Sequence, residues 1–205
     1  MKSYSFEKLT GLAAIAAGVA AFLYAYAFII LSRSDPQTGG LFSALFLLLQ
    51  GLLITKVYVA LYHRVYKKHP SVSLWALILG IASALGMAIH GGYDLANAIN
   101  LPDQIVLALA NLPSQIDPRG LLTFGIGGWV LFTFSWLIQK TKTFSDGLVW
   151  LGYASAIMMV VLYVGRLTVL SPASPIILWP AIINGFIVSP LWYIWVGLNL
   201  WSKKA

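Results

Sequence analysis

The sequence predicts an all-α polytopic membrane protein, a bundle of six transmembrane helices with both termini in the cytoplasm. Three observations lead to this fold class. Hydrophobic residues make up 60% of the 205 residues and charged residues only 9%, whereas soluble domains carry about 25% charged residues. Six apolar segments are long enough to cross a bilayer, and most lysines and arginines gather on one side of them.

The six segments each approach or exceed the roughly 20 residues that a helix needs to cross an apolar layer of about 30 Å. We predict one domain, 1–205, with spans at 9–31, 41–62, 74–93, 121–138, 148–170 and 176–201. The first span contains Ala-Tyr-Ala at 25–27, which is typical of signal-peptide cleavage. Its apolar run continues to Leu31, so we interpret it as a retained transmembrane helix.

The placement of basic residues predicts the orientation, because cytoplasmic loops are enriched in lysine and arginine. With the N-terminus inside, the outer side holds only Arg33 and Arg119. The inner side then holds Lys2, Lys8, Arg64, Lys67, Lys68, Lys140, Lys142, Lys203 and Lys204. This asymmetry favours six spans in a cell membrane, with both termini cytoplasmic.

The segment 94–120 is predicted to be an outer loop. Its centre, 105–110, is apolar but too short to span, and prolines flank it. Two interpretations stay open: a connector that lies on the membrane interface, or a lid over a binding site.

Composition also narrows the functional classes. The chain has no cysteine, which excludes disulfides and thiolate chemistry. The net charge of +7 comes without an aromatic-rich basic patch, so we expect no nucleic-acid partner. We find no phosphate-binding loop, no nucleophile elbow and no metal-ligand spacing among the three histidines. We therefore expect no cofactor, no metal and no catalytic residue of these classes.

The third segment carries two stripes with helical spacing. Ala76, Gly80, Ala84, Ala88, Gly92 and Ala96 would let another helix approach closely. The first segment has a similar series at Gly11, Ala14, Gly18, Ala21 and Ala25. These two helices are therefore candidate close partners, and a dimer interface is the alternative use of the small residues. The second stripe of the third segment contains Ser83, Met87, His90, Asp94 and Asn97.

Depth along the helices places several polar groups in the outer half of the membrane. At 1.5 Å per residue, His90 lies about 24 Å and Asp94 about 30 Å from the inner side, and Arg166 lies about 27 Å from it. Gln50 and Asn184 lie roughly 12–14 Å below the outer side. Tyr163 falls in the same half. We predict that these groups face one pocket.

The central hypothesis is an ion pair between Asp94 and Arg166, with His90 hydrogen-bonded beside it. Pairing would reduce the cost of about 2.5–3.5 kcal/mol for a charge at the bilayer centre. The alternatives are that Arg166 reaches the lipid headgroups and that His90 is a structural residue. The predicted ligand-binding residues are His90, Asp94, Asn97, Arg166, Gln50, Asn184 and Tyr163, with Asp117 and Arg119 at the opening.

The stretches "IHGGYDLANAIN" and "LPSQIDPRGLLTFG" resemble small multi-pass integral membrane proteins of bacteria. The resemblance implies a bacterial inner-membrane location and no particular activity. We expect a non-enzymatic protein whose outward-facing pocket binds a small molecule or a lipid headgroup. The alternatives are a small transporter, which could be proton-coupled, a membrane-embedded lipid-modifying enzyme, and a structural subunit. Its partners would be the lipid bilayer and a further copy or another membrane protein.

Overall fold

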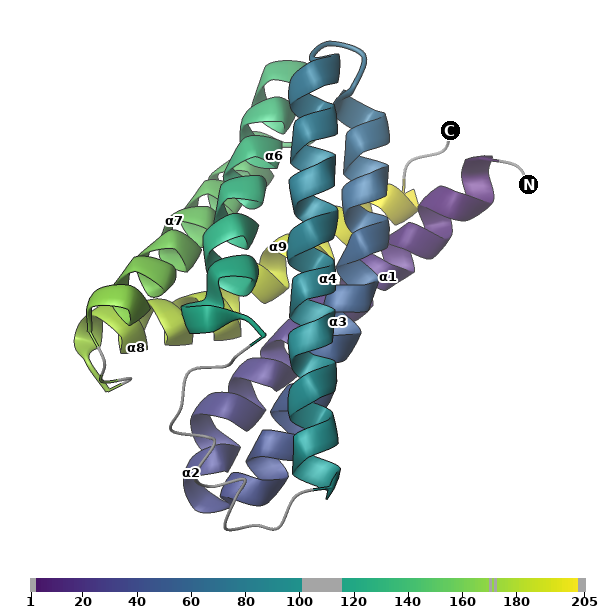
Figure 1. Ribbon diagram of the computed structural model, residues 1–205. Coiled ribbons are helices and arrows are strands. Elements are labelled where there is room, and N and C mark those ends of the chain that lie inside the picture. Colours follow the sequence, from purple (N-terminus) through teal and green to yellow (C-terminus); the bar gives the residue numbers. More distant parts are fainter. Residues whose placement is uncertain (1–2, 101–115, 170, 172, 203–205) are drawn as a thin grey trace.

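The computed structural model describes residues 3–100, 116–169, 171 and 173–202, and every element in that part of the chain is helical (Figure 1). Six stretches are long and apolar enough to cross a membrane: Phe6–Ser34, Pro36–Val65, Pro70–Asn100, Pro118–Thr141, Asp146–Thr168 and Pro175–Ser202. Large hydrophobic side chains such as Ile78, Ile89 and Trp150 are exposed on their outer surfaces. The predicted six-helix membrane bundle is confirmed.

Three of the six stretches contain more than one element. The first consists of α1 (Ser3–Tyr26), η1 (Ala27–Leu31) and α2 (Ser32–Ser34), and the second and third are α3 (Pro36–Val65) and α4 (Pro70–Asn100). The fourth consists of η2 (Pro118–Gly120), η3 (Leu121–Ile126) and α6 (Gly127–Thr141), and the fifth is α7 (Asp146–Thr168). The sixth consists of α8 (Pro175–Ile183), η4 (Asn184–Val188) and α9 (Ser189–Ser202). The segments η1, η3 and η4 are π-helical, and η2 is a 3₁₀ turn.

The sequence leaves two ends open for the third span, Tyr93 and Ile99, and the structure agrees with the longer one. Helix α4 continues to Asn100, so residues 94–100 belong to the helix and not to the outer loop. These residues contain no helix breaker, and the first proline follows at position 102. The Asn100 side chain donates to the carbonyl oxygen of Ala96 over 2.8 Å. The predicted interfacial segment 105–110 lies outside the described residues.

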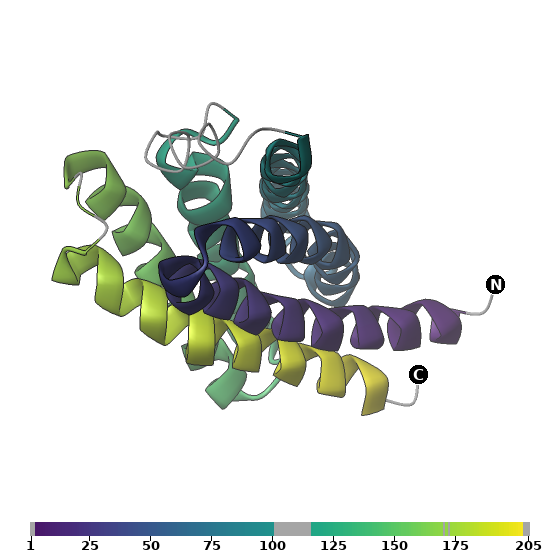
Figure 2. The ribbon, with the colours of Figure 1, turned by 90° about the horizontal axis from the view of Figure 1, so that it is seen from below.

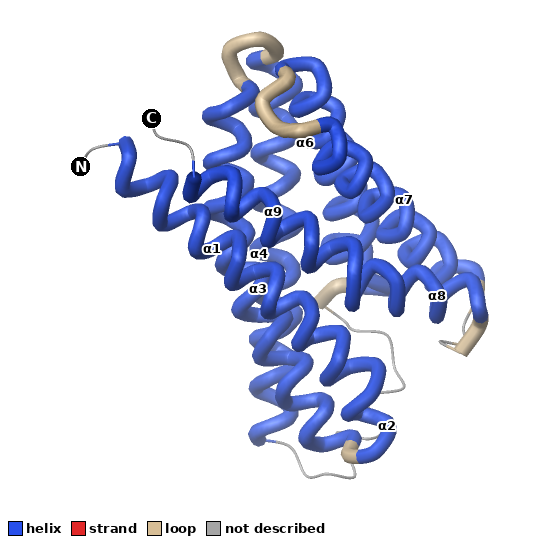
Figure 3. The backbone as a smooth tube through the Cα atoms, turned by 180° about the vertical axis from the view of Figure 1, so that it is seen from behind, coloured by secondary structure: helices blue, strands red, loops and turns tan. Residues whose placement is uncertain are grey.

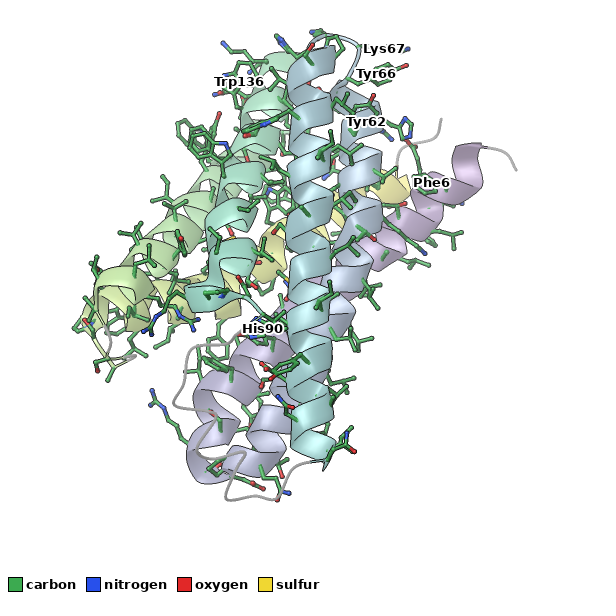
Figure 4. All side chains as sticks on the ribbon, in the orientation of Figure 1. Phe6, Tyr62, Tyr66, Lys67, His90 and Trp136 are labelled. Carbon is green, nitrogen blue, oxygen red and sulfur yellow. The ribbon has the colours of Figure 1, made fainter. Side chains whose placement is uncertain are left out.

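Both termini lie toward the end of the bundle where α3 connects to α4 and α6 connects to α7 (Figure 1). Tyr62, Tyr66, Lys67 and Trp136 lie near this end (Figure 4), and aromatic and basic side chains are typical of a membrane interface. Arg64 donates to both carboxylate oxygens of Glu7, at 2.9 and 2.8 Å, and thereby joins α3 to α1. We call this the inner end, in line with the predicted orientation, and the opposite one the outer end.

Glycine allows α3 and α4 to pack backbone against backbone. A Cβ atom at Gly51 would lie 2.6 Å from the amide nitrogen of Ala88 and 2.7 Å from the carbonyl oxygen of Ala84. A Cβ atom at Gly91 would likewise meet the backbone of Leu48. Backbone atoms cannot move aside as a flexible side chain can, so the small residues set the distance between these helices.

The predicted pairing of the first and third spans is wrong. The small residues of α4 face α3, and α3 lies between α1 and α4 (Figure 2). The glycines of α1 instead meet α9, where a Cβ atom at Gly11 would lie 2.9 Å from the carbonyl oxygen of Gly197. Small residues permit a close approach by any helix, so both stripes are packing seams, but with other partners.

We expect Gly91→Ala to lower the free energy of unfolding by about 1–3 kcal/mol, because the added methyl group meets backbone atoms of α3. The matched control is Gly40→Ala, since nothing lies within 4 Å of a Cβ atom at Gly40. Thermal unfolding of the purified protein in detergent measures both. Equal melting temperatures for the two variants would contradict the packing of α3 on α4.

Candidate functional site

A cavity of about 270 Å³ lies between the helices, in the outer half and centre of the bundle. Its walls come from all six spanning stretches. Apolar side chains such as Phe28, Ile54 and Leu162 form part of the lining. The polar and charged lining residues are Tyr24, Gln50, Tyr58, Ser83, Arg119, Thr123, Arg166, Asn184, Ser189 and Tyr193. The cavity is therefore amphipathic.

All three π-helical segments of the described chain line this cavity. They contribute Phe28 and Ile29 from η1, Thr123 and Phe124 from η3, and Asn184 and Gly185 from η4. A π-helical turn has poorer geometry than an α-helical turn, is rare, and is found frequently at functional sites. The irregular backbone of three separate spans thus converges on one place.

The carboxylate of Asp117 organises the start of the fourth span. It accepts hydrogen bonds from the amide nitrogen of Leu122 at 2.7 Å, from that of Thr123 at 3.0 Å and from the Thr123 hydroxyl at 2.6 Å. These amides belong to the first turn of η3 and have no partner within the helix. Asp117 is only 1% exposed. Burial raises the pKa of its carboxyl, but the His90 ring and the donors of Thr123 and Leu122 outweigh burial and lower it to about 2.

The turn that follows Asp117 has an unusual backbone. Arg119 has φ 59° and Gly120 has φ 81°, so two consecutive residues adopt the left-handed conformation. Only glycine does so without strain, and a strained residue of another type points to a functional constraint. Arg119 is among the residues that line the cavity.

His90 joins this turn to α4. Its Nε2 lies 3.1 Å from a carboxylate oxygen of Asp94, one helical turn along, and its Nδ1 lies 3.7 Å from a carboxylate oxygen of Asp117. The second distance is too long for a hydrogen bond. Figure 4 shows His90 on the side of α4 that faces η2 and η3. Within the described residues, this group has no metal-binding geometry.

The hypothesis of an Asp94–Arg166 ion pair is wrong. Asp94 contacts His90, while the guanidinium carbon of Arg166 lies 5.6 Å from the centre of the Phe124 ring. The segments η2 and η3 both contact α7, and η3 also contacts α4. They therefore lie between the two helices whose charges the hypothesis pairs. Equal depth along two helices does not identify the partner of a charged side chain.

The structure divides the nine predicted site residues into three groups. Four line the cavity: Gln50, Arg119, Arg166 and Asn184. Three form the adjacent cluster: His90, Asp94 and Asp117. Asn97 and Tyr163 line neither, and Tyr163 packs against Gly125.

Sequence reasoning missed the residues that hold the charged groups in place. Thr123 binds Asp117, and Phe124 lies beneath Arg166. A Cβ atom at Gly120 would overlap the Phe124 ring, so glycine is required there by space as well as by its φ angle. The Asp-Pro-Arg-Gly sequence at 117–120 was the available signal, since it is typical of a tight turn before a helix.

Two buried serine side chains below the turn are hydrogen-bonded. The carbonyl oxygen of the Asn184 side chain accepts a hydrogen bond of 2.7 Å from Ser155, which joins η4 to α7. Ser83 donates to the backbone carbonyl of Leu122 over 2.7 Å and joins α4 to η3. Ser83 and His90, two residues of the polar stripe on the third span, thus face the start of the fourth span.

No family model matches the chain, and comparison with curated proteins and with solved structures found no match either. The resemblance of two stretches to bacterial membrane proteins therefore stays a prediction.

We expect Asp117→Asn to lower the free energy of unfolding by about 1–3 kcal/mol near neutral pH, because an amide cannot accept all the bonds that the carboxylate accepts. The pKa of Asp117 is lowered in the folded protein, so this carboxylate stabilises the fold at high pH. Its contribution is complete above about pH 4 and is lost as the pH falls toward about 2.

Melting temperatures measured across this range check the prediction. The gap between wild type and Asp117→Asn should be largest at neutral pH and should close on acidification. Asp146→Asn is the matched control, since its exposed pair with Lys142 contributes little. A gap that stays constant down to about pH 2 would contradict the role of the Asp117 carboxylate.

Proposed function

We propose that this integral membrane protein binds a small amphipathic molecule in the cavity between its six spans. The observation that carries the proposal is the convergence of three π-helical segments on one cavity with a mixed polar and apolar lining. Irregular backbone at membrane depth is tolerated where it lines a cavity or is buried in protein. The protein places it around this cavity on three different spans.

The size and chemistry of the cavity agree with a ligand site. Ligand pockets usually measure about 300–1,000 Å³ and are mostly apolar, with a few polar groups that fix orientation. The volume here, about 270 Å³, is close to the lower limit. Gln50 and Arg166, from α3 and α7, are polar groups of this kind.

The proposed location is the bacterial inner membrane, with both termini in the cytoplasm. The clustering of lysine and arginine at the inner end supports this orientation. The cavity would then open to the outer half of the membrane, near the end where α4 stops and η2 begins.

Transport is the second candidate function, and one observation favours it. The sixth span is interrupted by Pro180 and by η4, and Asn184 lines the cavity at the interruption. Discontinuous helices of this kind form substrate sites in transporters. Uptake of the bound molecule into proteoliposomes would distinguish transport from binding alone.

Native mass spectrometry of the purified protein tests the binding proposal. Wild type should retain a small molecule or a lipid through detergent exchange, whereas Ala181→Phe should lose it because the ring fills the cavity that Ala181 lines. The control is Ala82→Phe, which adds the same ring on an exposed face of α4. Equal retention by both variants, or no retained molecule in wild type, would contradict the proposal.

A further inference from the structure

We propose that the ligand is an anionic lipid, with its phosphate or carboxylate held by Arg119 and Arg166 and its acyl chain leaving the cavity sideways between η1 and α8. This inference rests on the proposed function, because it names the chemical class of the molecule that the cavity binds. Three observations carry it: the charges in the lining, the way the two arginines are held, and a groove that continues from the cavity.

The cavity lining, as far as the described residues form it, contains two arginines and no aspartate or glutamate. Among the described residues, neither Arg119 nor Arg166 lies within ion-pair distance of an acidic side chain. The nearby carboxylates of Asp94 and Asp117 contact His90 and do not line the cavity. Two positive charges in a partly apolar space are costly without a counter-charge. An anionic headgroup would supply one.

The backbone of Arg119 and the side chain of Arg166 are both placed by contacts within the protein. Arg119 lies in the left-handed turn that Asp117 closes, and the η2 turn contacts α7, which carries Arg166. Arg166 lies over the ring of Phe124, and Phe124 in turn packs where Gly120 has no side chain. A guanidinium stacked on a ring keeps its N–H donors in its own plane, where they can bind a carboxylate or phosphate in a bidentate manner.

A second hollow continues from the cavity. A groove of about 540 Å³ is lined by the apolar residues Ile30, Leu178, Ile182 and Phe186, and it shares Ile29 with the cavity. Arg33 and Ser34 belong to the same groove. The groove therefore lies next to the cavity, between the first and sixth spans, and its lining is mainly apolar.

The packing of the first and sixth spans explains why this groove exists. The inner parts of α1 and α9 are in close contact, and a Cβ atom at Gly18 would lie 2.7 Å from the carbonyl oxygen of Pro190. Toward the outer end, α2 and α8 diverge (Figure 3), and η1 and α8 do not pack closely. The surface here faces the bilayer, so the occupant to which we commit is a lipid chain from the membrane.

The volume of the cavity supports the same placement of the lipid, with its headgroup in the cavity and its acyl chain in the groove. The cavity measures about 270 Å³, close to the lower limit of about 300 Å³ for ligand pockets. We expect it to hold the headgroup of the lipid. A full acyl chain would have to continue into the groove, which begins at Ile29.

The test measures lipid binding to the detergent-purified full-length protein by native mass spectrometry. The probes are phosphatidylglycerol and phosphatidylcholine with identical acyl chains, and inorganic phosphate alone. Wild type should bind phosphatidylglycerol about tenfold or more tightly than phosphatidylcholine, in line with charge-assisted hydrogen bonds. Inorganic phosphate should not displace it, because the acyl chain also contributes to binding.

The variants Arg119→Gln and Arg166→Gln should each weaken phosphatidylglycerol binding about tenfold to a hundredfold. They should weaken phosphatidylcholine binding less, because the choline ammonium already offsets the charge of that lipid's phosphate and is repelled by the arginines. Lys68→Gln is the matched control, since it removes an exposed charge at the inner end and should change neither. Unchanged melting temperatures in the absence of added lipid would show that both arginine variants fold.

The alternative outcomes separate the two proposals. Equal binding of both lipids, lost in Ala181→Phe, would overturn the anionic inference and leave the proposed function standing. Displacement by inorganic phosphate would show that a free anion is the ligand and would overturn the lipid assignment. No binding of either lipid to wild type would overturn the lipid inference, and the absence of any retained molecule in wild type would overturn both proposals. A loss in Lys68→Gln equal to that in the arginine variants would also overturn the inference, because it would indicate binding by overall charge.

Discussion

The buried carboxylate of Asp117 is the interaction on which the outer half of the protein depends. It closes the turn before the fourth span by accepting hydrogen bonds from the amides of Leu122 and Thr123, and it faces His90 on α4. A helix that starts inside a membrane bundle cannot leave these amides unpaired without a large cost. The Asp117 side chain thus pairs the free amides at the start of η3 and places that start next to His90 on α4. The direction of the following residues depends on this placement.

The position of this turn explains the chemistry of the cavity. Because η2 and η3 lie between α4 and α7, the acidic groups contact His90 on one side, and the arginines remain on the other. Arg119 and Arg166 line the cavity together with the π-helical segments. Near the same cavity α2 diverges from α8 (Figure 3), and a mainly apolar groove lies between the first and sixth spans. The acidic groups are thus separated from the arginines, and the helices α2 and α8 are loosely packed. Both features distinguish this site from the rest of the bundle.

The fold could be predicted well from the sequence, because an uninterrupted run of about twenty apolar residues matches the thickness of a bilayer and few soluble structures. Depth counting also placed Arg166, Gln50 and Asn184 in the same half of the bundle, and all three line one cavity. Partners were harder to predict. The small residues of α4 match α3 and not α1, and Asp94 contacts His90 and not Arg166. Hydropathy and spacing specify which face of a helix is buried, but they do not specify which helix covers that face. For Asp94 and Arg166, the outcome depends on how the short η2–η3 segment packs between α4 and α7.

Photo-labelling in liposomes tests the central claim most directly. A phosphatidylglycerol with a photoreactive group in its acyl chain would be activated, and the labelled residues would be mapped by mass spectrometry. We predict strong labelling in η1 and α8, around Ile29 and Ile182, that excess unlabelled phosphatidylglycerol suppresses. Labelling of Ile78 and Ile89 on the exposed face of α4 should be weaker and insensitive to competition. Equal labelling of both surfaces, unaffected by the competitor, would contradict a specific lipid site.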